Sequence, residues 1–182
     1  MAHKKIKSYD IVITALMTAL IAVCSLVAIP VGAVPVTLQT FAVFVAIGIC
    51  GCKKGTVAVL LYILLGIVGL LPVFSGFQSG IGVLAGPTGG YISGFLLSAL
   101  VSGFIAEKTG RKIGFMILSF SAGLVICYLS GLLWYIYVFS GGKADFTSAF
   151  SLCVLPYIIP DCIKIILAAV VSKTVGERLK KI

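Results

Sequence analysis

The stretch IVITALMTALIAVCSLVAI occupies residues 11–29 and follows three lysines, Lys4, Lys5 and Lys7. Counted from position 11 to position 29, it has 19 residues, most of them apolar. A secretory signal peptide has an apolar core of about 7–15 residues, whereas a helix needs about 20 residues to cross a bilayer. We therefore interpret this stretch as a first membrane-spanning helix and not as a cleaved leader peptide.

The whole chain shares this apolar character. Of its 182 residues, 60% are hydrophobic and 10% are charged. An average soluble domain has about 25% charged residues, and a domain of this size cannot bury so large an apolar fraction. The composition predicts an integral membrane protein with a single domain over residues 1–182. It leaves no room for a fused ATPase or another large soluble module.

The basic residues divide the chain into pairs of helices. Twelve of the 14 lysines and arginines fall in four clusters, which are Lys4, Lys5 and Lys7; Lys53 and Lys54; Lys108, Arg111 and Lys112; and Lys173, Arg178, Lys180 and Lys181. The apolar stretches between clusters are about 45–60 residues long, enough for two spans of about 20 residues each. Basic loops stay on the cytoplasmic side, so both termini are expected in the cytoplasm. The number of crossings is then even, and six fits the length.

These patterns define the expected fold class. It is an all-α integral membrane protein with six transmembrane helices and a glycine-rich outer loop that lines a ligand cavity. The six predicted spans are residues 10–29, 38–52, 56–71, 88–106, 113–139 and 148–172. Residues 73–87 form the glycine-rich outer segment, and a cytoplasmic turn is expected at residues 53–55.

Asp161 is the acidic residue that lies inside a predicted span and not at its end, and Lys164 follows three positions later, on the same helix face. Pro160 suits the first turn of a helix, so we expect the last span to bend there and to turn Asp161 toward a cavity. Ionisable residues within a membrane are costly and usually functional. A carboxylate beside an ammonium suits a ligand with both N–H and C=O groups, such as a cyclic urea or amide. The alternative is an ion pair with a purely structural role.

Six glycines lie between residues 76 and 91. Irregular backbone at membrane depth is tolerated where it lines a cavity, so we expect this segment to face the same ligand. The candidate contacts are the side chains of Gln78, Ser79 and Thr88, the backbone near Gly86, and the rings of Phe74, Phe77 and Tyr91. The alternative is a flexible outer loop.

Two further patterns involve the first two spans. Thr37, Gln39 and Thr40 place hydrogen-bonding side chains at the outer start of the second span, where they could cover the cavity or cap the helix. Ala15 and Ala19 form a small-xxx-small face in the first span, which permits close packing against an internal helix or another protein.

The sequence gives no support for a catalytic or metal centre. Its single histidine, His3, lies in the N-terminal tail, and the six cysteines all fall in apolar segments. Free cysteines of this kind behave as small hydrophobic residues. We therefore expect no metal, no cofactor and no enzymatic activity.

Three motifs resemble a known family. Val34-Pro-Val-Thr-Leu-Gln-Thr-Phe41, Leu84-Ala-Gly-Pro-Thr-Gly-Gly-Tyr91 and Pro160-Asp-Cys-Ile-Lys164 occur in the order and spacing of the BioY family, the biotin-specific substrate-binding component of energy-coupling factor (ECF) transporters. The resemblance covers essentially the whole chain.

The resemblance implies high-affinity capture of biotin near the outer face of a prokaryotic plasma membrane. By this match, Asp161 and Lys164 hold the ureido group of biotin, and Gln78 or Ser79 completes those contacts. The implied partners are a transmembrane coupling protein, which docks on Ala15 and Ala19, and two cytoplasmic ATPases. Two other functions are left open: a self-sufficient carrier of biotin or another vitamin, and a membrane enzyme acting on a lipid.

Overall fold

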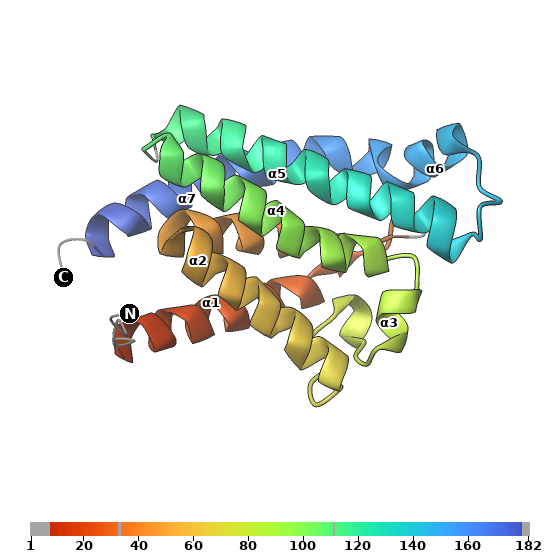
Figure 1. Cartoon of the computed structure of the whole chain (residues 1–182), viewed down its shortest axis with the longest axis horizontal. Helices are drawn as coiled ribbons and strands as arrows, with labels where there is room; N and C mark the ends of the chain where they lie inside the picture. Colours follow the sequence, from red (N-terminus) through yellow and green to blue (C-terminus); the bar gives the residue numbers. More distant parts are fainter. Residues whose placement is uncertain (1–7, 33, 111, 180–182) are drawn as a thin grey trace, which may run out of the picture.

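The computed structural model describes residues 8–32, 34–110 and 112–179, which are mostly helical (Figure 1). In chain order the elements are α1 (Ser8–Leu26), β1 (Ala28–Ile29), β2 (Val36–Thr37), α2 (Gln39–Val68), η1 (Ser75–Phe77), α3 (Gly82–Ala85), α4 (Gly89–Lys108), α5 (Ile113–Trp134), η2 (Tyr135–Phe139), α6 (Phe146–Cys153), η3 (Leu155–Tyr157) and α7 (Ile158–Leu179). The two short strands pair antiparallel, with Ala28 opposite Thr37.

Helix α2 is a hairpin with two arms. Gly51, with φ 83° and ψ 177°, leaves the helical region and separates residues 39–50 from residues 52–68. Gln39 Nε2 lies 2.6 Å from the Tyr62 hydroxyl oxygen, whereas a straight helix would separate these residues by about 34 Å. The arms therefore run antiparallel. The chain reverses slightly earlier than the predicted turn at 53–55, because glycine adopts a positive φ without a Cβ clash.

Five helical segments of the described chain are long and apolar enough to cross a membrane: Ser8–Leu26, Gln39–Val68, Gly89–Lys108, Ile113–Phe139 and Phe146–Leu179. The second and third predicted spans coincide with the two arms of α2. The last predicted span is divided into α6 and α7, because Val154, with φ −123° and ψ −52°, interrupts the regular backbone. The expected bend therefore lies before Pro160 and not at it.

Small residues allow these helices to approach closely. Helix α4 packs against α5 and α2, α1 packs against α2, and α7 packs against α2 and α5. A Cβ added at Gly103 would lie 2.7 Å from the Cα of Cys52, so α4 and the turn of α2 are nearly in backbone contact. Ser119 of α5 donates a hydrogen bond to the carbonyl of Ser102 in α4. Close contacts and interhelical hydrogen bonds of this kind stabilise helix bundles in lipid.

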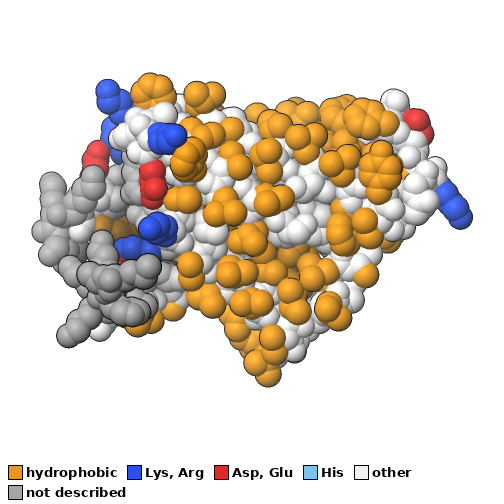
Figure 2. Space-filling model, viewed as in Figure 1, with side chains coloured by type: hydrophobic (Ala, Val, Ile, Leu, Met, Phe, Trp, Pro, Cys, Tyr) orange, Lys and Arg blue, Asp and Glu red, His pale blue; other side chains and the backbone are white. Residues whose placement is uncertain are grey.

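The surface separates into an apolar body and two polar ends. Figure 2 shows hydrophobic side chains over most of the length of the bundle. Leu16 of α1 and Leu118 of α5 are examples of exposed apolar residues, at 60% and 61% exposed. Lysines and arginines gather at the end where α1 begins and α7 finishes, while Lys143 and Asp145 lie in the η2–α6 turn (Figures 1 and 2). This distribution is that of a protein whose middle faces lipid.

Candidate functional site

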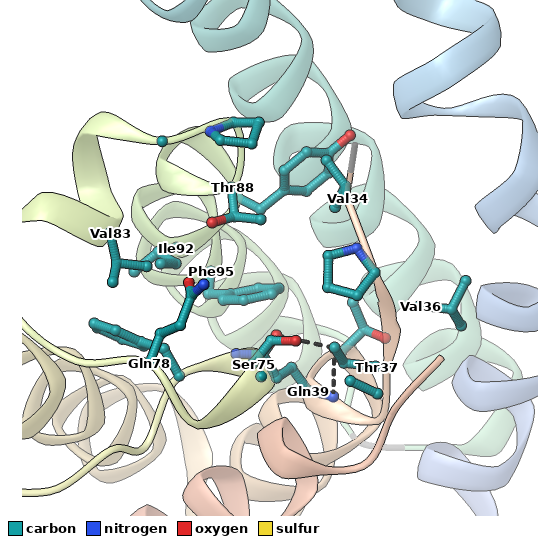
Figure 3. Close-up of a pocket in the computed structure, with 18 of the residues that line it drawn as sticks. Val34, Val36, Thr37, Gln39, Ser75, Gln78, Val83, Thr88, Ile92 and Phe95 are labelled. Carbon is teal, nitrogen blue, oxygen red and sulfur yellow. Dashed lines mark hydrogen bonds between the residues drawn. The ribbon is translucent and has the colours of Figure 1, made fainter. Parts of the chain in front are cut away.

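A cavity of about 840 Å³ lies away from the basic end of the bundle, between the ends of several helices and the loops that connect them (Figure 3). One wall is the segment around β1 and β2, together with the first turn of α2. Residues 74–88 form the opposite wall, and the first turns of α4 and α7 and part of α5 close the base. Figure 3 shows Val34, Gln78 and Thr88 facing this space from different segments.

Nine of the residues that the sequence nominated for ligand contact lie together on the lining of this one cavity. They are Thr37, Gln39, Gln78, Ser79, Gly86, Thr88, Tyr91, Asp161 and Lys164. Asp161, Lys164, Gln39 and Tyr91 are buried, Thr37, Gly86 and Thr88 are half-buried, and Gln78 and Ser79 are exposed. The polar groups therefore extend from the buried base of the cavity to its water-facing mouth.

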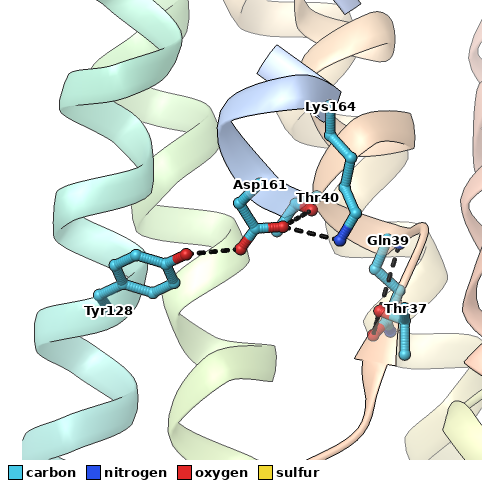
Figure 4. Close-up of polar contacts among 6 residues, drawn as sticks. All are labelled: Thr37, Gln39, Thr40, Tyr128, Asp161 and Lys164. Atoms are coloured by element: carbon cyan, nitrogen blue, oxygen red, sulfur yellow. Dashed lines mark hydrogen bonds and ion pairs between the residues drawn. The ribbon is translucent and has the colours of Figure 1, made fainter. Parts of the chain in front are cut away.

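Asp161 is the centre of a polar network that joins three helices (Figure 4). Its Oδ1 accepts hydrogen bonds from Lys164 Nζ at 2.7 Å and from Thr40 Oγ1 at 2.9 Å. Its Oδ2 accepts a hydrogen bond from the Tyr128 hydroxyl at 2.7 Å. The side chains of Asp161 and Lys164 are only 6% and 10% exposed. A buried charge requires such partners, and the network fixes the carboxylate at the base of the cavity.

The start of α2 carries a second network. Gln39 Oε1 accepts a hydrogen bond from Thr37 Oγ1 at 2.9 Å, and Gln39 Nε2 donates to the Tyr62 hydroxyl at 2.6 Å. The backbone N–H of Gln39 also donates to Thr37 Oγ1 at 3.3 Å. Thr37 therefore lines the cavity and also accepts a hydrogen bond from the backbone N–H of the first residue of α2, while the N-cap residue Leu38 makes no side-chain cap hydrogen bond.

The glycine-rich segment is folded and packed. Phe74 and Gln78 form an antiparallel bridge, with N···O distances of 2.9 and 3.2 Å. The backbone N–H of Gly80 donates to the carbonyl of Gly66 at 2.7 Å, and Gly80 has φ 93°, a conformation that suits glycine. Trp134 Nε1 donates to the carbonyl of Gly86 at 3.2 Å. These bonds attach the segment to α2 and α5 and hold it against the cavity, as expected of a lining loop.

The apolar part of the cavity differs in one residue from the expectation. Phe74 is 1% exposed and packs edge-on against Tyr62, with ring centroids 5.7 Å apart, and Tyr91 lies on the same lining. Phe77 instead has φ 58° and is 69% exposed, outside the residues that line the cavity. The left-handed backbone of Phe77, within the turn closed by the Phe74–Gln78 bridge, leaves its side chain outside the cavity lining. Ile92 and Phe95 of α4 contribute apolar lining in addition.

Several lining residues were not nominated from the sequence. One is Tyr128 of α5, which donates to Asp161. Another is Tyr157 of η3, directly before α7, whose hydroxyl donates to the carbonyl of Val34 and so attaches η3 to the β1–β2 segment. Tyrosines in an apolar span look like any other aromatic side chain in sequence. Their roles depend on contacts with residues 33 and 123 positions away, for which the sequence contains no local signal.

Ala15 and Ala19 lie on an exposed face of α1. Neighbouring residues Ile13, Met17 and Ile21 are buried against the bundle, so the two alanines face outward. The small-residue face of α1 therefore does not pack against another helix within the described part of the chain.

A family model described as the BioY family matches residues 1–181. The chain belongs to the BioY family. A protein named biotin transporter BioY from Thermotoga maritima is 42% identical over 167 residues, which cover 92% of this chain and 93% of that protein. A probable biotin transporter BioY from Pyrococcus horikoshii is 36% identical over 167 residues, covering 92% of this chain and 96% of that one.

A solved structure has the same fold. It is described as the S-component for biotin from an ECF-type ABC transporter, and it aligns with a TM-score of 0.85 at 28% identity. The alignment covers 100% of this chain and 95% of the solved one. These names place the BioY family among membrane transport proteins and not among enzymes.

Proposed function

We propose that this chain captures biotin at the outer face of the membrane, as the substrate-binding (S) component of an ECF-type transporter. The observation that carries this proposal is the buried Asp161–Lys164 pair, with Nζ and Oδ1 2.7 Å apart, at the base of a large cavity in a BioY family protein.

The chemistry of the pair fits the ureido ring of biotin. A carboxylate accepts hydrogen bonds from N–H groups, and an ammonium donates to a carbonyl oxygen. Of the three N–H bonds of Lys164, one is directed at Asp161, which leaves donors for a ureido oxygen. The buried rings of Phe74 and Tyr91 supply apolar surface for the fused rings of biotin. Gln78 or Ser79 is the side chain that we expect to complete the polar contacts.

The test is equilibrium binding of biotin to the purified full-length chain, with riboflavin and thiamine as competitors. We expect tight binding that neither competitor displaces. Absence of biotin binding by folded, ligand-free protein would contradict the proposal. A self-sufficient carrier differs from an S component in one respect: uptake in cells would persist after the ATPases are deleted.

We propose that the chain associates with a transmembrane coupling protein and two cytoplasmic ATPases, which supply the energy for biotin uptake. The exposed Ala15–Ala19 face of α1 is the surface proposed to bind the coupling protein. Small residues allow two helix backbones to approach closely, and this face is not covered by the described part of the chain.

Replacing Ala15 or Ala19 by tryptophan is expected to prevent assembly and leave biotin affinity unchanged. The indole ring would hold the two helices apart, while the cavity lies elsewhere on the chain. Co-purification of the coupling protein and ATPases with the variant measures assembly. Leu118→Trp, on the lipid-facing side of α5, is the matched control and should assemble normally. Normal assembly of both alanine variants would show that α1 uses another face.

We further propose six membrane crossings, with both termini in the cytoplasm of a prokaryotic cell and the chain in its plasma membrane. Each arm of α2 then counts as one crossing. The basic end of the bundle, where Lys54, Lys112 and Lys173 lie close to the start of α1 and the end of α7, faces the cytoplasm by the positive-inside rule.

A cysteine at position 143 is expected to react with an impermeant maleimide from outside intact cells. A cysteine at position 112 should react only after permeabilisation. Both Lys143 and Lys112 are exposed, so neither substitution disturbs packing. Position 112 is chosen in preference to position 110 in the same loop, because Gly110 has φ 77°, a backbone conformation that cysteine would strain. The parent chain, with its six native cysteines, provides the background. Reversed labelling would invert the proposed orientation.

A further inference from the structure

The cavity has no net charge. Its charged lining residues in the described chain are Asp161 and Lys164, which neutralise each other at 2.7 Å. All the remaining side chains that line it are uncharged, and the polar ones are alcohols, amides, phenols and a thiol.

This neutrality is independent of how the cavity walls move. Residues 11–52, 55–106, 113–142 and 146–160 contain no Asp, Glu, Lys or Arg. Every wall other than α7 is built from these segments, including the β1–β2 segment and the glycine-rich segment. Closure of either segment over a ligand therefore brings no further cation into the site.

A ligand with a carboxylate tail meets an asymmetric site. The neutral ion pair matches an uncharged cyclic urea, whose N–H and C=O groups it can hydrogen-bond. A carboxylate buried beside it would lack a counter-ion, which is strongly unfavourable. The charged end of the tail must therefore stay near the mouth, where the lining residues Pro30 and Gly76 are exposed and water can reach. A neutral carbonyl oxygen at the end of the tail can accept hydrogen bonds from that water in the same way.

We propose that the site recognises the ureido ring and does not recognise the charge of the tail, so that it also binds biotin whose carboxyl group is converted to an amide or ester. This inference rests on the proposed function, since it takes Asp161 and Lys164 as the ureido contacts. It enlarges the ligand class from free biotin to uncharged biotin derivatives.

The experiment compares dissociation constants of the purified full-length chain for biotin, biotinamide and biotin methyl ester. Pentanoate, which has the tail without the rings, is the matched control ligand. We expect both derivatives to bind within ten-fold of biotin, and pentanoate not to displace biotin.

Two results would overturn the inference while leaving the proposed function intact. One is tight binding of biotin with both derivatives weakened by more than ten-fold. The other is displacement of biotin by pentanoate, because either result requires a site for the tail carboxylate. Failure of biotin itself to bind would instead contradict the proposed function, so the two failures are distinguishable.

Discussion

Asp161→Asn is expected to reduce biotin affinity by about 1000-fold. One ureido N–H loses a charged acceptor, and Lys164 loses the charged partner that directs it toward the ureido oxygen. Hydrogen bonds to charged groups contribute about 1.5–3 kcal/mol each, so two weakened bonds give about 4 kcal/mol, or about three powers of ten in affinity. Equilibrium binding of biotin to wild type and variant measures the effect.

Asparagine is preferred to alanine for this test because it retains the size of Asp161 and an oxygen that can accept from Thr40 or Tyr128. Removing one member of a buried ion pair altogether destabilises a protein by about 3–5 kcal/mol, which would confuse loss of binding with loss of folding. Size-exclusion chromatography of the purified variant checks the fold.

Asp145→Asn is the matched control for Asp161→Asn. Asp145 is an exposed acid that caps α6, accepting from the N–H groups of Thr147 and Ser148 at 3.0 and 3.4 Å, and it does not line the cavity. Its removal should leave the biotin dissociation constant within two-fold of wild type. Unchanged affinity in Asp161→Asn, with the control also unchanged, would exclude this carboxylate as a ligand contact.

The helices were predictable from sequence because long apolar stretches in this chain have few other solutions. Lipid provides no partners for backbone N–H and C=O groups, so an apolar stretch of sufficient length must form hydrogen bonds within itself. The basic clusters fixed where hairpins end. Exact boundaries were less certain: the reversal at Gly51 depends on one backbone conformation within a glycine- and cysteine-rich turn, which hydropathy does not detect.

The candidate site was predictable where its residues carry a local signal. Asp161 is conspicuous in an apolar span, and the glycines and amides of residues 76–91 are conspicuous in an otherwise apolar chain. Tyr128 has no such signal, because its place beside Asp161 depends on how α5 and α7 pack. Phe77 is the opposite case: an aromatic ring at this position was expected to line the cavity, but the left-handed local backbone leaves the side chain outside it.

Gly89→Ala is expected to lower biotin affinity by about 5- to 150-fold and to lower thermal stability. A Cβ at this position would lie 1.8 Å from the carbonyl oxygen of Leu84 and 2.7 Å from its carbonyl carbon, so backbone must move. The first turn of α4 cannot easily yield, because a Cβ at the adjacent Gly90 would already lie 2.6 Å from the Ser130 carbonyl oxygen. The glycine-rich segment is therefore the part that shifts, by about 1.5 Å to restore ordinary contact.

That shift reaches the cavity directly, because Gly86 and Thr88 belong to its lining and the Gly86 carbonyl accepts from Trp134 Nε1. Overpacking of this kind costs about 1–3 kcal/mol, which corresponds to about 5- to 150-fold in affinity if it falls on the bound state. Gly114→Ala makes the same change in α5, but its Cβ would meet nothing within 4 Å and Gly114 does not line the cavity, so affinity should stay within three-fold of wild type. Equal biotin affinity in Gly89→Ala and Gly114→Ala would mean that the α3–α4 junction does not shape the binding site, and the cavity wall formed by residues 82–88 would lose its proposed role.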